Sequence, residues 1–133
     1  MNQRDQLIKE IRGESLGIVS NQSSSEELFQ NEVLRPILKF QNDLFIASFL
    51  NYISKYKRDF YTKTVENKLA IIENAIQKDI KFRNALKGMI IALFTMDEYA
   101  LYIQNSSSLN KRMMNLLIER LKSQVQLFEN MEH

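Results

Sequence analysis

The sequence predicts an all-α protein: a single-domain bundle of five or six helices, with one helix kinked near Pro36. Three observations support this fold class. The chain has 133 residues, the size of one domain, and 44% of them are hydrophobic, which is enough for a core. Its 3 Gly and 1 Pro are too few for the many tight turns of a sandwich or barrel. No segment alternates apolar and polar residues in the manner of a half-buried strand.

Residues 1–22 are expected to form a short helix followed by a loop, in a region that packs more loosely than the rest. Apolar residues at helical spacing within residues 3–12 predict the helix, and Gly13 is suited to end it. The stretch GESLGIVSNQSSS comes next, and its mixture of Gly, Ser and Asn is typical of a loop.

Two overlapping S-x-x-E sequences in residues 23–27 match the capping box and predict a helix start near Ser24 or Ser25. Apolar residues then continue in helical register past the single proline. Because proline lacks an amide hydrogen and crowds the preceding turn, a kink or break is expected within Leu34–Pro36. One long bent helix and two separate helices fit residues 25–57 equally well.

After the polar tether KRDFYTKT, the helical pattern resumes and covers residues 64–94, as either one helix or two that meet near Lys78 and Asp79. Thr95–Glu98 is a further capping box, which predicts a new short helix that stops at the polar run Asn105–Ser108. One serine of that run is expected to cap the last helix. Apolar residues of the last helix follow heptad-like spacing: Met114, Ile118, Leu121, Val125 and Phe128. Further apolar residues widen this face, which favours packing in a bundle over a coiled coil.

The sequence lacks residues that most enzyme active sites require. It has no Cys and a single His, His133, which excludes disulfides, thiolate chemistry and a histidine-based triad in the body of the fold. Zinc would find almost only carboxylate ligands, and none of the three glycines belongs to a nucleotide-binding motif. We therefore expect no metal and no cofactor, and a non-catalytic role is favoured over an enzymatic one.

Three polar residues lie along the predicted apolar faces: Asp43, Glu73 and Arg83. In one interpretation, Arg83 anchors an anionic ligand in a pocket between helices, with Asp43 or Glu73 as an acid or base. In the other interpretation, which is favoured, these residues form a partly buried salt bridge that fixes helix register, with tyrosine hydroxyls nearby.

Residues 55–87 are the most basic part of the chain, with nine basic and four acidic residues and a local charge of +5. Aromatic residues are interleaved with the cations, as in nucleic-acid-binding proteins. A solvated basic face is nevertheless favoured over an RNA or DNA surface, because Phe60 and Phe82 are expected in the core rather than exposed to bases.

The last helix carries a wide, methionine-rich apolar face: Met113, Met114, Leu117, Ile118 and Leu121. This face is a candidate interface, because methionine adapts to different partners, although ordinary core packing explains it at least as well. The favoured function is a protein-interaction module that self-associates as a homo-oligomer or binds another protein. The longest apolar run has six residues and the N-terminus lacks a secretory signal, so we expect no membrane insertion and a cytoplasmic location.

Three stretches are similar to a family of short bacterial all-helical proteins without an established activity: LRPILKFQNDLFI, IENAIQKDIKFRNALKGMIIALFT and NKRMMNLLIERLKSQVQLF. The resemblance spans about the last hundred residues and implies an all-helical fold. Some sequences of this kind are labelled glyoxalase. Glyoxalases use His and Glu metal ligands on βαβββ modules, or a His-rich binuclear site, and no residue of this chain corresponds to those ligands. The resemblance therefore transfers no site residue.

Overall fold

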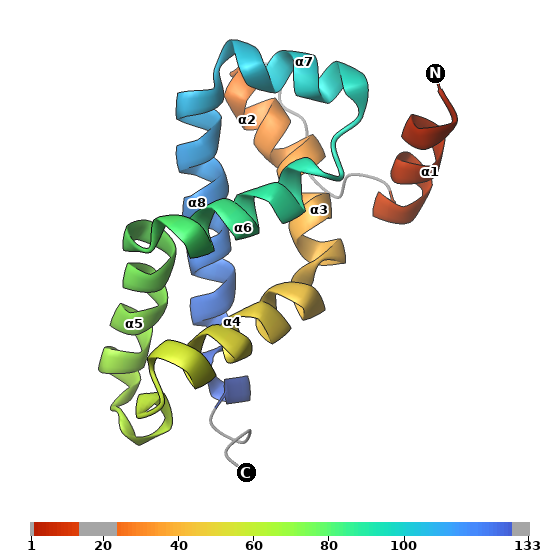
Figure 1. The fold of residues 1–133 in the computed structure, drawn as a ribbon. Helices are drawn as coiled ribbons and strands as arrows, with labels where there is room; N and C mark the ends of the chain where they lie inside the picture. The colour runs from red at the N-terminus through yellow and green to blue at the C-terminus, as the bar shows by residue number, and fades with distance from the viewer. Residues whose placement is uncertain (1, 14–23, 129–133) are drawn as a thin grey trace.

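The computed structural model describes residues 2–13 and 24–128, and within these residues every regular element is helical (Figure 1). The all-α prediction is confirmed for this part of the chain. The α-helices are α1 (Gln3–Arg12), α2 (Ser25–Phe29), α3 (Arg35–Phe40), α4 (Asn42–Tyr56), α5 (Val65–Lys78), α6 (Ile80–Ile91), α7 (Met96–Gln104) and α8 (Ser106–Ser123). A π-helical segment, η1 (Gln30–Leu34), joins α2 to α3, and 3-10 turns are formed by η2 (Phe60–Thr62) and η3 (Val125–Phe128).

If α2, η1 and α3 are counted as one continuous helix, the described residues form seven helices. The predicted number of helices, five or six, is therefore too low. Both segments that the sequence left open are divided. Residues 25–57 break at Gln41, which separates α3 from α4. Residues 64–94 break at Asp79, whose extended backbone ends α5 and whose side chain accepts a hydrogen bond from the Phe82 amide at 3.1 Å.

The chain stays helical through Pro36, so the prediction of a kink within Leu34–Pro36 is wrong. The turn before the proline widens instead, so that the Arg35 amide bonds to the Gln30 carbonyl five residues earlier. This wider turn relieves the crowding that proline imposes on the residues before it. The regular helix is interrupted later, at Gln41.

Two of the predicted helix starts are confirmed by their caps. Ser24 caps α2, and Thr95 caps α7 in a full reciprocal capping box with Glu98. The last helix differs from the prediction, because α8 begins without a side-chain cap. Its Ser108 hydroxyl donates to Glu26 of α2 at 2.8 Å instead, which joins the starts of α2 and α8.

One hydrophobic core extends from α2 to η3, and α8 crosses behind α6 in Figure 1 and packs against α5 and α6. Five phenylalanines are fully buried in it: Phe45, Phe49, Phe60, Phe94 and Phe128. The methionine-rich face belongs to the same core: Met113, Met114, Leu117, Ile118 and Leu121. The prediction that this face forms an interface is therefore wrong, because these side chains fill the interior of the chain and are not available to a partner.

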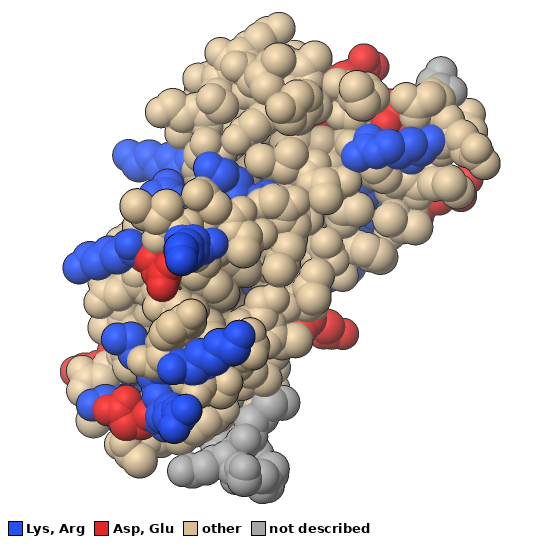
Figure 2. Space-filling view, in the orientation of Figure 1, with Lys and Arg blue, Asp and Glu red and all other residues tan. Residues whose placement is uncertain are grey.

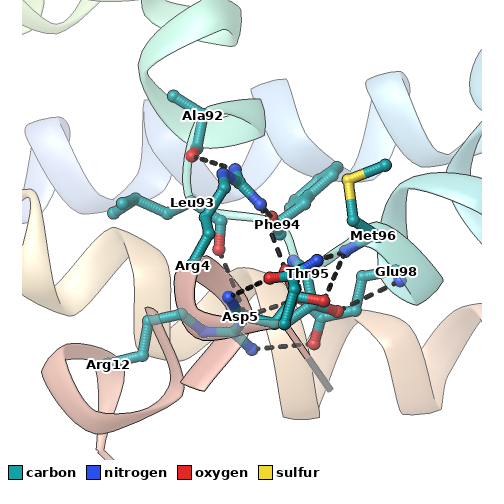
Figure 3. Close-up of polar contacts among 10 residues, drawn as sticks. Arg4, Asp5, Arg12, Ala92, Leu93, Phe94, Thr95, Met96 and Glu98 are labelled. Carbon is teal, nitrogen blue, oxygen red and sulfur yellow. Dashed lines mark hydrogen bonds and ion pairs between the residues drawn. The ribbon is translucent and has the colours of Figure 1, made fainter. Parts of the chain in front are cut away.

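The first helix, α1, is attached at the corner between α6 and α7 through polar contacts (Figure 3). Arg4 donates hydrogen bonds to the carbonyls of Phe94 and Ala92, each at 2.9 Å. The Asp5 carboxylate accepts hydrogen bonds from the Met96 amide, at 3.2 and 3.3 Å to its two oxygens. α1 thus satisfies backbone groups that the end of α6 and the start of α7 leave unpaired.

Arg12 makes the densest set of contacts of α1. It pairs with Glu98 of α7 at 2.5 Å and also donates to the carbonyl of Glu32 at 3.4 Å. That carbonyl lies four residues before the proline and would bond to the amide that proline lacks. Ile8 is the one apolar side chain of α1 that is buried. Gly13 ends α1 as predicted, and the loop expected after it lies mostly outside the described residues.

Candidate functional site: a basic aromatic groove between α4 and α6

The structure does not bring Asp43, Glu73 and Arg83 together. Glu73 on α5 pairs with Lys122 of α8, with 3.2 Å between Oε2 and Nζ. Asp43 is exposed in the first turn of α4, and Arg83 is half-buried on α6. Among the described residues the Arg83 side chain has no hydrogen-bond or ion-pair partner, so the predicted salt bridge is not formed there. None of the three residues lines the cavities discussed below.

A cavity of about 520 Å³ lies between α4 and α6 and is lined by aromatic rings. Tyr52 and Tyr56 are one turn apart on the same face of α4, with ring centroids 5.2 Å apart. Phe82, in the first turn of α6, stacks on Tyr52 with centroids 4.3 Å apart and ring planes 22° apart. Tyr56 is 65% exposed, so its ring remains open to a further planar group.

Exposed lysines lie beside these rings. Lys55 and Lys81 line the same cavity. A second cavity, of about 620 Å³, shares Lys81 with the first and adds Lys57 and Lys78. Figure 2 shows positive side chains gathered over the ends of α4, α5 and α6, whereas the surface over α7 is largely uncharged. We call the two adjoining cavities the basic groove.

Asp79 positions the aromatic rings of the basic groove. Its Oδ1 accepts the Phe82 amide at 3.1 Å, and its Oδ2 accepts the Tyr52 hydroxyl at 3.3 Å. Partial burial, together with the negative charge of Asp79, raises the pKa of Tyr52 above its usual value. One carboxylate therefore caps α6 and holds the Tyr52 ring against Phe82.

Not every basic residue of the stretch 55–87 belongs to the groove. Lys68 is buried, with its Nζ 5.7 Å from the centroid of the Phe60 ring. Lys63 pairs with Asp59 at 3.0 Å. Phe60 lies in the core as predicted, whereas Phe82 is only partly buried and packs on the core while lining the groove.

Sequence reasoning treated the tyrosines only as sources of hydroxyl groups and missed the aromatic stack. The spacing of Tyr52 and Tyr56, with Lys55 between them, is a signal for the α4 side of the groove. Phe82 lies on another helix, and its place against Tyr52 depends on how α4 and α6 pack.

The basic groove supplies aromatic faces, on which planar groups stack, and ammonium groups, which attract anions. Its one carboxylate, Asp79, accepts hydrogen bonds from the Phe82 amide and the Tyr52 hydroxyl. Within the described residues, no group of three or more His, Asp and Glu side chains is placed to hold a metal ion. In that same part of the chain, no helix has both the length and the apolar character needed to cross a membrane. Comparison with protein-family models, with curated proteins and with solved structures gives no match for this chain.

Proposed function

We propose that the protein binds single-stranded nucleic acid in the basic groove. The exposed ring of Tyr56, tilted against the stacked pair of Tyr52 and Phe82 and beside exposed lysines, is the observation that carries this proposal. Every base has a π-face, so an exposed ring such as that of Tyr56 binds an unpaired base with little dependence on sequence. The neighbouring lysines neutralise the phosphates on either side of that base.

The shape of the groove supports a strand as its ligand. Two cavities of about 520 and 620 Å³ adjoin, and their lysines come from α4, α5, α6 and the residue that follows α4. A duplex fits less well, because its bases are stacked on one another and offer no free face to Tyr56. The sequence alone favours a solvated basic face, and the exposure of Tyr56 is what argues for a ligand.

Fluorescence anisotropy with a short labelled oligothymidylate tests the proposal. Lysines that neutralise four phosphates give a slope of about −3 when the logarithm of the binding constant is plotted against the logarithm of the salt concentration. Tyr56→Ala is expected to weaken binding by about fivefold to a hundredfold, the usual effect of losing one stacked base. Phe40→Ala is the matched control, because Phe40 is an exposed aromatic residue on α3, outside the groove.

The charge contribution has its own pair of variants. Lys81→Ala is expected to reduce the salt slope by about 0.7, the contribution of one phosphate on a single strand. Lys111→Ala removes an exposed lysine of α8 that does not line the groove and is expected to leave the slope unchanged. Unaltered affinity of Tyr56→Ala, or tighter binding of a duplex than of a single strand, contradicts the proposal.

Self-association is favoured by the sequence, and for it we propose a different surface from the methionine-rich face of α8. α7 exposes four large apolar side chains, each 44–57% exposed: Met96, Tyr99, Leu101 and Ile103. The sequence from Tyr99 to Asn110 carries no charge, and uncharged apolar surface of this kind is typical of interfaces. We propose α7 as the contact between two copies of the chain. In sedimentation equilibrium, Ile103→Glu is expected to dissociate a wild-type dimer, and a monomeric wild type contradicts this second proposal.

A further inference from the structure

Two arginines lie at a cavity where α3, the start of α4 and α8 meet. The cavity has a volume of about 400 Å³, and Arg35 of α3 and Arg120 of α8 both line it. Leu38 and Leu116 form an apolar part of its wall, and both are buried. It shares no lining residue with the basic groove.

Neutral amide side chains hold both guanidinium groups. Arg120 donates from Nη1 to Asn42 Oδ1 at 3.3 Å. Asn42 is itself fixed by Gln124, because the two amides exchange hydrogen bonds of 2.8 Å in both directions. Arg35 donates from Nε to Asn31 Oδ1 at 3.0 Å. These bonds orient the arginines and leave further N–H groups of each guanidinium for another acceptor.

Neither arginine of this cavity forms an ion pair with a described residue. Glu119 also lines the cavity, yet no ion pair joins it to Arg35 or to Arg120 in the described chain. Partial burial, and then the nearby charge of Arg35, lower the pKa of Arg120 from its usual value. An anion between the two groups would remove this repulsion and form charge-assisted hydrogen bonds.

We propose that this cavity binds a small organic anion through Arg35 and Arg120. Its phosphate or carboxylate head contacts the two guanidinium groups, whose planar forks match the oxygens of either head group. Its apolar body packs against Leu38 and Leu116. The volume of about 400 Å³ lies in the range of small-molecule sites and exceeds the needs of an inorganic ion alone.

Isothermal titration calorimetry with three probes tests the site. Phenyl phosphate and benzoate distinguish the two head groups, and inorganic phosphate measures the head group without an apolar body. Saturable binding of phenyl phosphate or benzoate to the wild type is expected. Phenyl phosphate is expected to bind about tenfold more tightly than inorganic phosphate, because the leucine wall excludes water from its ring. Absence of saturable binding for both organic probes overturns the proposal.

Arginine variants locate the binding. Arg35→Met and Arg120→Met are each expected to weaken binding by about tenfold or more, the effect of losing hydrogen bonds to a charged group. Arg83→Met is the matched control, because Arg83 is a half-buried arginine that lies outside the cavity. Circular dichroism checks folding. If Arg120→Met fails to fold, the exposed Arg35 decides, and wild-type affinity in Arg35→Met overturns the proposal.

A further variant separates this site from the basic groove, since phenyl phosphate also resembles a ligand for an aromatic stack. Tyr56→Ala, which is expected to lose nucleic-acid affinity, is expected to bind phenyl phosphate as tightly as the wild type does. Weaker binding of phenyl phosphate by Tyr56→Ala, with unchanged binding by Arg35→Met, would place the anion in the groove and overturn the assignment to Arg35 and Arg120.

Discussion

Replacing Arg12 by methionine tests how firmly α1 is attached to the rest of the fold. The Arg12 side chain is 6% exposed and donates two hydrogen bonds to the Glu98 carboxylate, at 2.5 and 3.0 Å. It donates two more to the carbonyls of Leu93 and Glu32, at 3.2 and 3.4 Å. Methionine keeps an apolar stem of similar length and removes all four bonds.

The expected effect follows from the burial of the pair. Removing one partner of a buried ion pair destabilises a protein by about 3–5 kcal/mol, because the other charge loses its partner. Glu98 is 15% exposed and still accepts the Thr95 amide at 2.8 Å, so the lower figure, about 3 kcal/mol, applies. Ile8 is the only buried apolar side chain of α1, and its burial contributes about 2 kcal/mol. The bonds of Arg4 and Asp5 remain, so we expect α1 to open locally more often while the core stays folded.

Amide hydrogen exchange distinguishes local detachment from global unfolding. In Arg12→Met, protection of α1 amides is expected to fall by about a hundredfold, which corresponds to about 3 kcal/mol, and protection in α8 is expected to stay at the wild-type level. Arg58→Met, which changes an exposed arginine after α4, is the control. Equal loss of protection in α1 and α8, or unchanged protection in α1, would refute the reasoning.

Three further predictions concern stability. Hydrogen bonds from Ser108 and then Asn105 hold the pKa of Glu26 below its usual value of 4.5. Ionised Glu26 therefore stabilises the fold above about pH 4.5, and this contribution is lost as the pH falls through the lowered pKa. Thermal melts from about pH 6 to about pH 3 are expected to show a smaller loss of Tm for Glu26→Gln than for the wild type. Gly88→Ala is expected to raise the free energy of unfolding in urea by about 0.5–1 kcal/mol, because the added methyl group meets no atom within 4 Å and alanine favours the helix; a decrease would contradict this. Leu117→Ala leaves a cavity in the core and is expected to lower the same quantity by about 2–5 kcal/mol, and a change below about 1 kcal/mol would argue against a closely packed α8.

Local signals were sufficient to predict the all-α class and several of the helix ends. The capping box Thr95–Glu98 and the glycine at position 13 act within one turn of the chain, and both do in the structure what the sequence predicts. The outcome at Pro36 depends on more distant contacts. A widened turn accommodates the proline, and Arg12, from another helix, bonds to the carbonyl of Glu32.

Periodicity identifies which residues share a face and does not identify what covers that face. The apolar stripe of α8 was correctly located in the sequence, but only the packing of α5 and α6 against it shows that it is core. The same limit applies to polar residues. Glu73 pairs with Lys122 from α8, while Tyr56 stays exposed although it continues the apolar register of α4.

The interruption at Gln41 determines where both proposed binding sites lie, because it sets the direction of α4. At the start of α4, Asn42 holds Arg120 at the anion cavity, and in its second half Tyr52 and Tyr56 line the basic groove. The Gln41 side chain donates to the Met89 carbonyl of α6 at 3.2 Å, which ties the interruption to the helix across the groove. Asn42 is a residue type that favours turns, so part of the signal was present in the sequence. The apolar register continues through this point and gives no sign of an interruption, whereas the missing amide of proline led to a kink being predicted near Pro36.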